Sequence, residues 1–178
     1  MSLLPARCLR RLCLALAVAV LAPAALAQVQ PSATEAAAYR GLLAKAHRGD
    51  VTGLEQAIAA GAPLNARDSH GRTALHIATF ARQQGVIRAL ARAGADLNLL
   101  ENDRYDAVTI ASVADDEDTL RLLLSLGAKA GQVTSRYDGT ALIAAAHLGH
   151  DGVVRELIKA GAPLDHVNNL HWTAVIES

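Results

Sequence analysis

The chain has 178 residues, enough for one domain with a sizeable core or for a short array of repeats. Apolar types make up 52% of the sequence and aromatic residues only 3%, which favours closely packed small helices over a β-sandwich. The 17 basic and 17 acidic residues balance, so neither nucleic acid nor an anionic membrane surface is an expected partner.

Residues 1–27 have the layout of a secretory signal peptide. A basic segment over 7–11 precedes an apolar run over 12–22, and Ala25-Leu26-Ala27 supplies the small residues that a signal peptidase requires. A membrane anchor needs about 20 apolar residues, and Pro23 ends this run well before that length. We therefore expect export by the general secretory route, with the twin-arginine route as the less favoured alternative.

Cleavage after Ala27 changes the chemistry of the product. Cys8 and Cys13, the two cysteines, leave with the signal, so the mature chain has no thiol for a disulfide, a nucleophile or a metal site. Three arginines leave as well, so 14 basic residues remain against 17 acidic ones, a net charge of −3. We expect a soluble, periplasmic or secreted protein with no stable membrane insertion.

Residues 28–39 are expected to be a linker that leads into a capping helix. Ser32 and Glu35 have the spacing of a capping box ahead of an alanine-rich segment over 36–45. The pattern predicts that this segment is the first helix of an N-terminal capping repeat.

The rest of the chain repeats with a period of 33 or 34 residues. A glycine-alanine phrase begins at Gly61, Gly94, Gly127 and Gly161, at intervals of 33, 33 and 34. A second phrase keeps the same register and begins at Thr73, Asp106, Thr140 and Thr173. Gly94, Gly127 and Gly161 each follow the start of a second phrase by 21 residues, and such a fixed period indicates a solenoid.

Each copy predicts two short helices. Thr73 and Thr140 are suitable N-caps for a first, alanine-rich helix. The second helix has helical apolar spacing, as in Val153, Val154 and Leu157. The phrase-initial glycines fall where a helix C-terminus requires a positive φ, and a hairpin loop then leads to the next copy.

This length and register resemble the ankyrin repeat, whose signature is T-P-L-H-x-A. The resemblance runs from about Arg40 to Ser178 and divides the chain into copies at about 40–72, 73–105, 106–139 and 140–172, with a partial copy at 173–178. It implies an all-α solenoid of stacked helix-turn-helix units with short β-hairpin loops.

The copies depart from the signature in places. Alanine replaces its proline throughout, and His76 is the one signature histidine that is kept. Gly71 keeps the glycine of the hairpin tip, whereas Arg104, Asp138 and His171 occupy that position later. The third copy has an extra residue before Thr140, so we expect its hairpin to be the loosest.

The sequence stops six residues into a fifth copy. No second helix follows there, and no polar terminal face is present of the kind that end repeats normally need. We expect that the sequence is a fragment, in preference to a last face covered by a partner.

Catalytic and metal-binding patterns are weak. The sequence has no Gly-rich phosphate loop, no G-x-S-x-G and no H-E-x-x-H, and no cofactor is expected. His147 and His150 are separated by a turn glycine, which favours surface histidines over a ligand pair. The acidic run over 115–118 could attract a cation, but a solvated helix start is the preferred interpretation.

The resemblance implies a concave binding face built from the residue before each signature threonine, the hairpin tips and the ends of the first helices. The residues that this frame assigns to the face are Arg48, His70, Arg72, Phe80, Asn102, Asp103, Tyr105, Tyr137, His147, Asn169 and Trp172. Four of the five aromatic residues thus occupy surface that the fold does not require, as is typical of interfaces. The alternative is that each ring packs on the neighbouring hairpin and stabilises the stack.

The sequence therefore favours an exported, non-catalytic scaffold that binds another protein through its concave face. A more specific alternative is an accessory or inhibitor protein dedicated to one exported enzyme or toxin. The surface residues do not identify the partner, because ankyrin scaffolds share a frame and differ in those residues.

Overall fold

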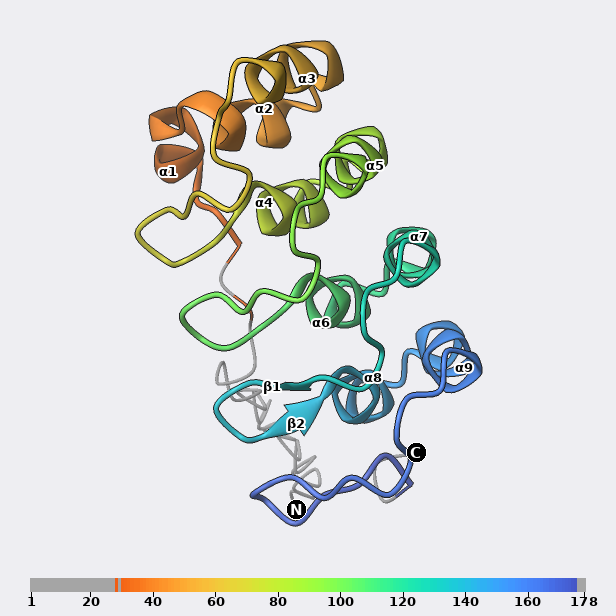
Figure 1. Ribbon diagram of the computed structural model, residues 1–178. Coiled ribbons are helices and arrows are strands. Elements are labelled where there is room, and N and C mark those ends of the chain that lie inside the picture. The colour runs from red at the N-terminus through yellow and green to blue at the C-terminus, as the bar shows by residue number, and fades with distance from the viewer. Residues whose placement is uncertain (1–27, 29, 176–178) are drawn as a thin grey trace, which may run out of the picture.

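The computed structural model describes residue 28 and residues 30–175, which form an elongated stack of helix pairs (Figure 1). The helices are α1 (Ala33–Ala38), α2 (Gly41–Arg48), α3 (Val51–Ala59), α4 (Ala74–Phe80), α5 (Gln84–Arg92), α6 (Ala107–Val113), α7 (Glu117–Ser125), α8 (Ala141–Leu148) and α9 (Asp151–Lys159). Two short antiparallel strands, β1 (Val133–Thr134) and β2 (Gly139–Thr140), complete the elements. The expected all-α solenoid of helix-turn-helix units with short hairpins is confirmed.

The helices form two columns. The first helices of the copies, α2, α4, α6 and α8, contact one another in sequence, and so do the second helices α3, α5, α7 and α9. Figure 1 shows the hairpin loops projecting from the side of the first column that faces away from the second. The first helices and the hairpins therefore share one side of the molecule.

Small side chains allow the first helices to pack closely. Ala46, Ala78 and Ala145 are fully buried in α2, α4 and α8. The second helices supply larger apolar groups at equivalent positions, and Leu90, Leu123 and Leu157 are each 0% exposed. Alanine together with leucine, isoleucine and valine thus fills a continuous core in a chain with few aromatic residues.

The turns follow the register of the repeat. The expected positive φ is found at the glycines that follow the second helices, for example 85° at Gly61 and 97° at Gly127. The hairpin tips also share one conformation, because φ is 74° at Gly71 and remains positive at Arg104, Asp138 and His171. The later copies thus keep the left-handed tip with residues other than glycine.

The N-terminal region differs from the prediction of one helix over 36–45. The capping box of Ser32 and Glu35 is present, but it begins the six-residue helix α1. The chain then becomes extended at Tyr39 and Arg40, before α2 begins at Gly41 with φ 55°. The Tyr39 side chain is buried and its hydroxyl donates to Asp68 Oδ2 at 3.0 Å, which requires the chain to turn inward there.

The hairpin of the third copy is not the loosest, and that expectation is wrong. Among the hairpins of the described residues it is the one with a strand ladder, in which Val133 pairs with Thr140 and Thr134 with Gly139. The Ser135 hydroxyl closes the tip by accepting the backbone N–H of Tyr137 at 3.2 Å.

No helix within the described ranges is long and apolar enough to cross a membrane. The signal peptide expected over residues 1–27 lies outside these ranges.

Candidate functional site: an aromatic groove

A groove opens between the hairpins of the third and fourth copies and the first helices α6 and α8. It contains about 580 Å³ of empty space, including its solvent-filled mouth, and its walls are mostly apolar. Side chains that line it include Tyr105, Val113, Tyr137, Ile143, His147, Leu148, Leu170 and Trp172. The structure therefore brings four of the sequence-predicted site residues, Tyr105, Tyr137, His147 and Trp172, to one place.

Hydrogen bonds to the backbone fix the hairpins that carry these rings. The Glu101 carboxylate accepts the backbone N–H of Tyr105 at 3.0 Å, and Asn168 Oδ1 accepts that of Trp172 at 2.9 Å. Neighbouring hairpins are also joined, since the backbone N–H of Asn169 donates to the Tyr137 carbonyl at 3.0 Å. The rings thus project from a restrained backbone, which suits a preorganised binding surface.

Trp172 stacks on His147, with ring centroids 5.3 Å apart and an angle of 19° between the planes. Tyr105 and Tyr137 are half-buried, and burial raises the pKa of the Tyr105 phenol. Trp172 thus packs on a side chain of α8, whereas the alternative that each ring packs on the neighbouring hairpin and stabilises the stack stays a prediction. Each of the three aromatic residues nevertheless keeps part of its surface on the groove.

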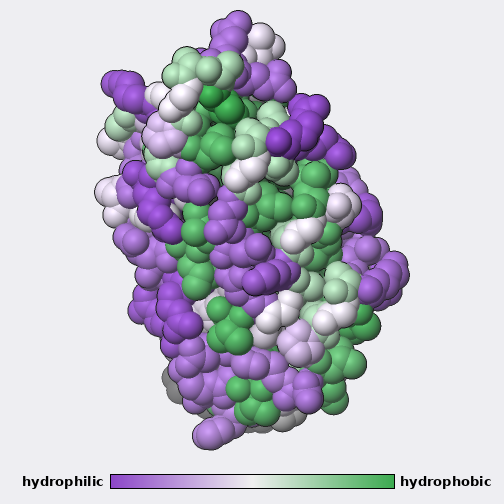
Figure 2. Space-filling view, viewed as in Figure 1, coloured by the Kyte–Doolittle hydropathy of each residue, from purple (hydrophilic) through white to green (hydrophobic). Residues whose placement is uncertain are grey.

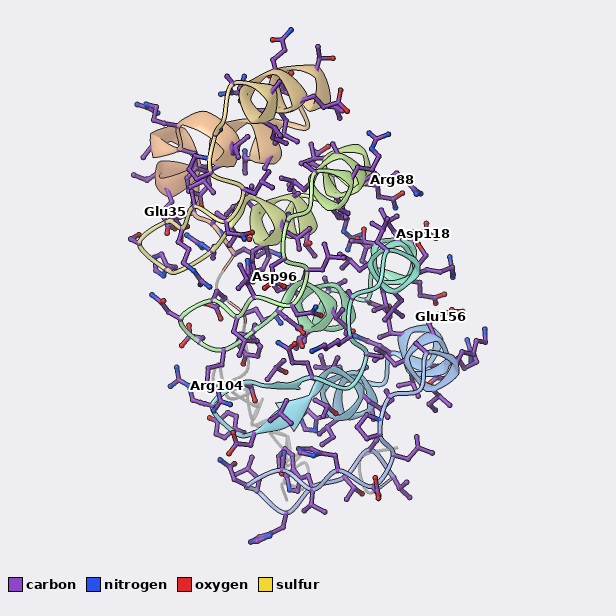
Figure 3. The ribbon with its side chains drawn as sticks, in the orientation of Figure 1. Glu35, Arg88, Asp96, Arg104, Asp118 and Glu156 are labelled. Carbon is purple, nitrogen blue, oxygen red and sulfur yellow. The ribbon has the colours of Figure 1, made fainter. Side chains whose placement is uncertain are left out.

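The rim of the groove carries cross-hairpin ion pairs. Arg104 Nη1 lies 2.9 Å from Asp138 Oδ1, and Arg136 Nη2 lies 2.6 Å from Asp103 Oδ1. Figure 3 labels Arg104 on the side of the molecule from which the hairpins project. The hydrogen bond that Arg136 donates to Asp103 raises the pKa of Arg136. Because each of these arginines is paired with an aspartate, the rim is close to neutral. The groove therefore offers a ligand apolar contact and not a net charge.

Two predicted site residues connect hairpins. The side-chain amide of Asn102 donates to the Ser69 carbonyl, and that of Asn169 donates to the Arg136 carbonyl, both at 3.2 Å. These amides satisfy backbone carbonyls of the preceding hairpin tip. Together with Asp103 they stabilise the spacing of the hairpins and lie outside the groove lining.

Three other predicted residues lie in the first two copies. Arg48 is exposed at the end of α2, and Phe80 is partly buried at the end of α4. His70 lies on the first hairpin, where its Nε2 is 2.8 Å from Glu35 Oε1 of α1. None of them lines the groove. Phe80 and His147 nevertheless occupy equivalent positions, since each stands two residues before a positive φ, at Arg82 and Gly149 respectively.

The prediction that Arg72 is an exposed binding residue is wrong. Its side chain is 1% exposed because Asp68 and Glu35 cover the guanidinium group, which lies 2.7 Å and 2.6 Å from their carboxylates. No charge at Arg72 is therefore available to steer an approaching partner while Glu35 is in place.

Sequence reasoning missed the apolar side chains of the groove. Leu148 is 43% exposed at the end of α8, and Leu170 is 40% exposed on the last hairpin. Figure 2 shows apolar surface among hydrophilic residues at the foot of the molecule, where the last copy lies. The sequence did contain a signal for Leu170, because it is an apolar residue at a hairpin tip, where polar residues are the norm.

The residues considered for metal binding have other partners. His150 Nδ1 lies 2.9 Å from the Ser112 carbonyl oxygen, whereas His147 stacks on Trp172. Asp116, in the acidic run, caps α7 by accepting the backbone N–H of Thr119 at 3.1 Å, as expected for a helix start. Over the described part of the chain, no group of three potential ligands is placed to hold a metal ion.

Comparison with known protein families agrees with this architecture. A model described as three copies of the ankyrin repeat matches residues 41–134, and a single-repeat model matches residues 137–169. No curated protein matches the chain.

Proposed function

Because this chain belongs to the ankyrin-repeat family, whose repeats generally mediate protein–protein interaction, we propose that it is an exported, non-catalytic scaffold that binds another protein through the aromatic groove. The groove lies on the side formed by the first helices and the hairpins, which is the concave face implied by the resemblance. One observation carries the proposal, namely that Tyr105, Tyr137 and Trp172 converge on one apolar hollow.

Aromatic side chains on a rigid surface that is partly shielded from solvent are typical anchors of protein interfaces. The buried apolar side chains of the first helices are alanine, leucine, isoleucine and valine, so the aromatic rings are not required to complete this core. The open mouth and apolar walls suit an apolar side chain inserted by a partner. The polar and ion-paired hairpin tips would then form the surrounding rim.

Substitution of the groove rings tests this proposal. In the Tyr105→Ala, Trp172→Ala double variant, we expect capture of the partner to weaken at least about tenfold, because removal of a central interface aromatic costs about 1–4 kcal/mol. The partner would be isolated with the mature protein as bait from the periplasmic or culture fraction, identified by mass spectrometry and titrated by calorimetry.

The control for that experiment is Phe80→Ala, which truncates an equivalent aromatic position outside the groove. The affinity of this variant for the partner should stay within about twofold of the affinity of the unmodified protein. Thermal melting would separate loss of contact from loss of structure, since removal of Trp172 also removes its stack on His147. Normal capture by a folded double variant would move the interface elsewhere.

The location is part of the proposal and rests on the sequence over residues 1–27. We expect the mature protein to begin at Gln28, in the periplasm or outside the cell. Mass analysis of the exported protein measures this directly. Exported protein that retains residues 1–27 would contradict cleavage and favour an N-terminal anchor.

A further inference from the structure

The first copy contains a buried arginine where later copies have a groove residue. Arg72 directly precedes Thr73, the N-cap of α4, as Tyr105 directly precedes the N-cap of α6. Its guanidinium is nearly fully covered, with Nε 2.7 Å from Asp68 Oδ2 and Nη2 2.6 Å from Glu35 Oε1. Two carboxylates from different elements therefore bind one cation.

Asp68 is held by hydrogen bonds within the hairpin that carries Arg72. It belongs to the same hairpin as Arg72, and its Oδ1 accepts the backbone N–H groups of His70 and Arg72, both at 2.9 Å. Tyr39 donates to Oδ2. Burial opposes ionisation of Asp68, but the hydrogen bonds from Arg72 and Tyr39 outweigh it and lower the pKa of its carboxyl. The Arg72 charge thus has a fixed counter-ion within its own hairpin.

Glu35 is held differently, because it comes from the short helix α1. Six residues are too few for a stable isolated helix, and α1 has no buried residue. Glu35 Oε2 accepts the backbone N–H of Ser32 at 2.8 Å, while Oε1 lies close to Arg72 and 2.8 Å from His70 Nε2. Bonds from Ser32 and Arg72 lower the pKa of Glu35 to about 2. One carboxylate both closes the start of α1 and attaches it to the first hairpin.

The attachment point is accessible from solvent. Figure 3 shows Glu35 between α1 and the first hairpin. An open hollow lies beside it, lined by Ala38, Tyr39, Leu43 and Ser69 among others. Another carboxylate could approach Arg72 through this hollow as Glu35 withdraws, with Asp68 still in place.

We propose that Arg72 and His70 form a carboxylate-binding site on the first copy, that the chain's own Glu35 occupies it, and that an acidic side chain of a partner replaces Glu35 when α1 is released. This extends the binding surface from the groove to the first copy, and in that respect it rests on the proposed function. The tests below use no partner, so their failure is distinguishable from failure of groove binding.

The first test measures the release of α1 by limited trypsin digestion after Arg40, which is exposed and lies between α1 and α2. In Glu35→Ala we expect cleavage there to be at least about tenfold faster, because charge-assisted hydrogen bonds that hold α1 are lost. The matched control is Glu55→Ala, which removes an exposed glutamate 3.1 Å from Arg92 and should leave this rate unchanged. Equal rates in Glu35→Ala and the unmodified protein, or faster cleavage at all arginines, would overturn the release of α1 as an independent unit.

The second test measures carboxylate binding, with acetate as the probe. In Glu35→Ala, the NMR signal of the Arg72 Nε–H group should shift saturably with sodium acetate and not with sodium chloride at equal ionic strength. The unmodified protein, in which Glu35 occupies the site, should show no saturable shift. A variant that gives no saturable acetate response, or the same response in both proteins, would overturn the carboxylate site.

Discussion

Leu157→Asp is expected to unfold the fourth copy. Leu157 lies in α9, is 0% exposed and occupies the position of Leu90 and Leu123 in the preceding copies. Loss of a buried leucine costs about 2–5 kcal/mol, and burial of an unpaired carboxylate adds several more. The sum is comparable with the whole stability of a small domain, about 5–15 kcal/mol. Because each repeat is stabilised mainly by its neighbours, the damage should be greatest in α8 and α9.

Far-UV circular dichroism and urea denaturation measure this effect. Helical signal should fall by the contribution of the last pair of helices, and the unfolding midpoint should decrease. Ile158→Asp is the matched control, since it places the same charge one residue later on a side chain that is 45% exposed. If both variants retain the helical signal and the midpoint of the unmodified protein, the assignment of Leu157 to the core is wrong.

Acidification from pH 6.5 to about 4 is expected to lower the free energy of unfolding through His76. Burial lowers the pKa of this histidine from 6.5 to about 4. Its Nδ1 accepts the backbone N–H of Thr73 at 3.1 Å, so the proton resides on Nε2, 3.0 Å from the Leu99 carbonyl oxygen. A second proton would have to enter on Nδ1, against the N–H group of Thr73.

The sign of the effect follows from the depressed pKa. Above pH 6.5 the histidine is neutral in the folded and in the unfolded chain, and its contribution to the free energy of unfolding is fully present. As the pH falls from 6.5 toward 4, the unfolded chain takes up the proton and the folded chain does not, so stability is lost. The shift of the pKa from 6.5 to about 4 corresponds to a loss of at most about 3 kcal/mol in the free energy of unfolding. This loss levels off below the pKa that His76 has in the folded chain.

Urea denaturation at a series of pH values between 7 and 4 measures this loss. His76→Leu provides the comparison, because it removes the titrating group and should be less stable at pH 7 yet flatter across this range. The buried Asp106 acts in the opposite direction, since burial raises the pKa of its carboxyl. The difference between the two proteins is therefore the relevant quantity, and parallel pH profiles would contradict the role assigned to His76.

Much of the fold could be predicted because the repeat pattern depends on local geometry. A glycine or its equivalent is placed where the backbone requires a positive φ, as at Gly61 and Gly71. Alanine and leucine recur at the spacing of short helices, and Thr140 caps α8 by accepting the backbone N–H of Ile143 at 3.3 Å. These preferences act within a few residues, so the sequence alone reveals them.

The site could be predicted only in part. The repeat frame assigned Tyr105, Tyr137, His147 and Trp172 to the same face, and the structure brings them to one groove. It did not indicate Leu148 or Leu170, because an apolar residue at a helix end or on a loop can point toward solvent or into a hollow. Which of these occurs depends on the neighbouring hairpin.

The sequence by itself determined the period, the two helices of each copy and the register that aligns the hairpins. Only the tertiary structure decided that Glu35 reaches across 37 residues to Arg72, that Tyr39 turns inward to Asp68, and that the groove forms between the last two hairpins. The physical reason is that helix caps and turns are satisfied by near neighbours along the chain. The exposure and charge of a side chain, in contrast, depend on groups that only the packing of separate copies brings within contact distance.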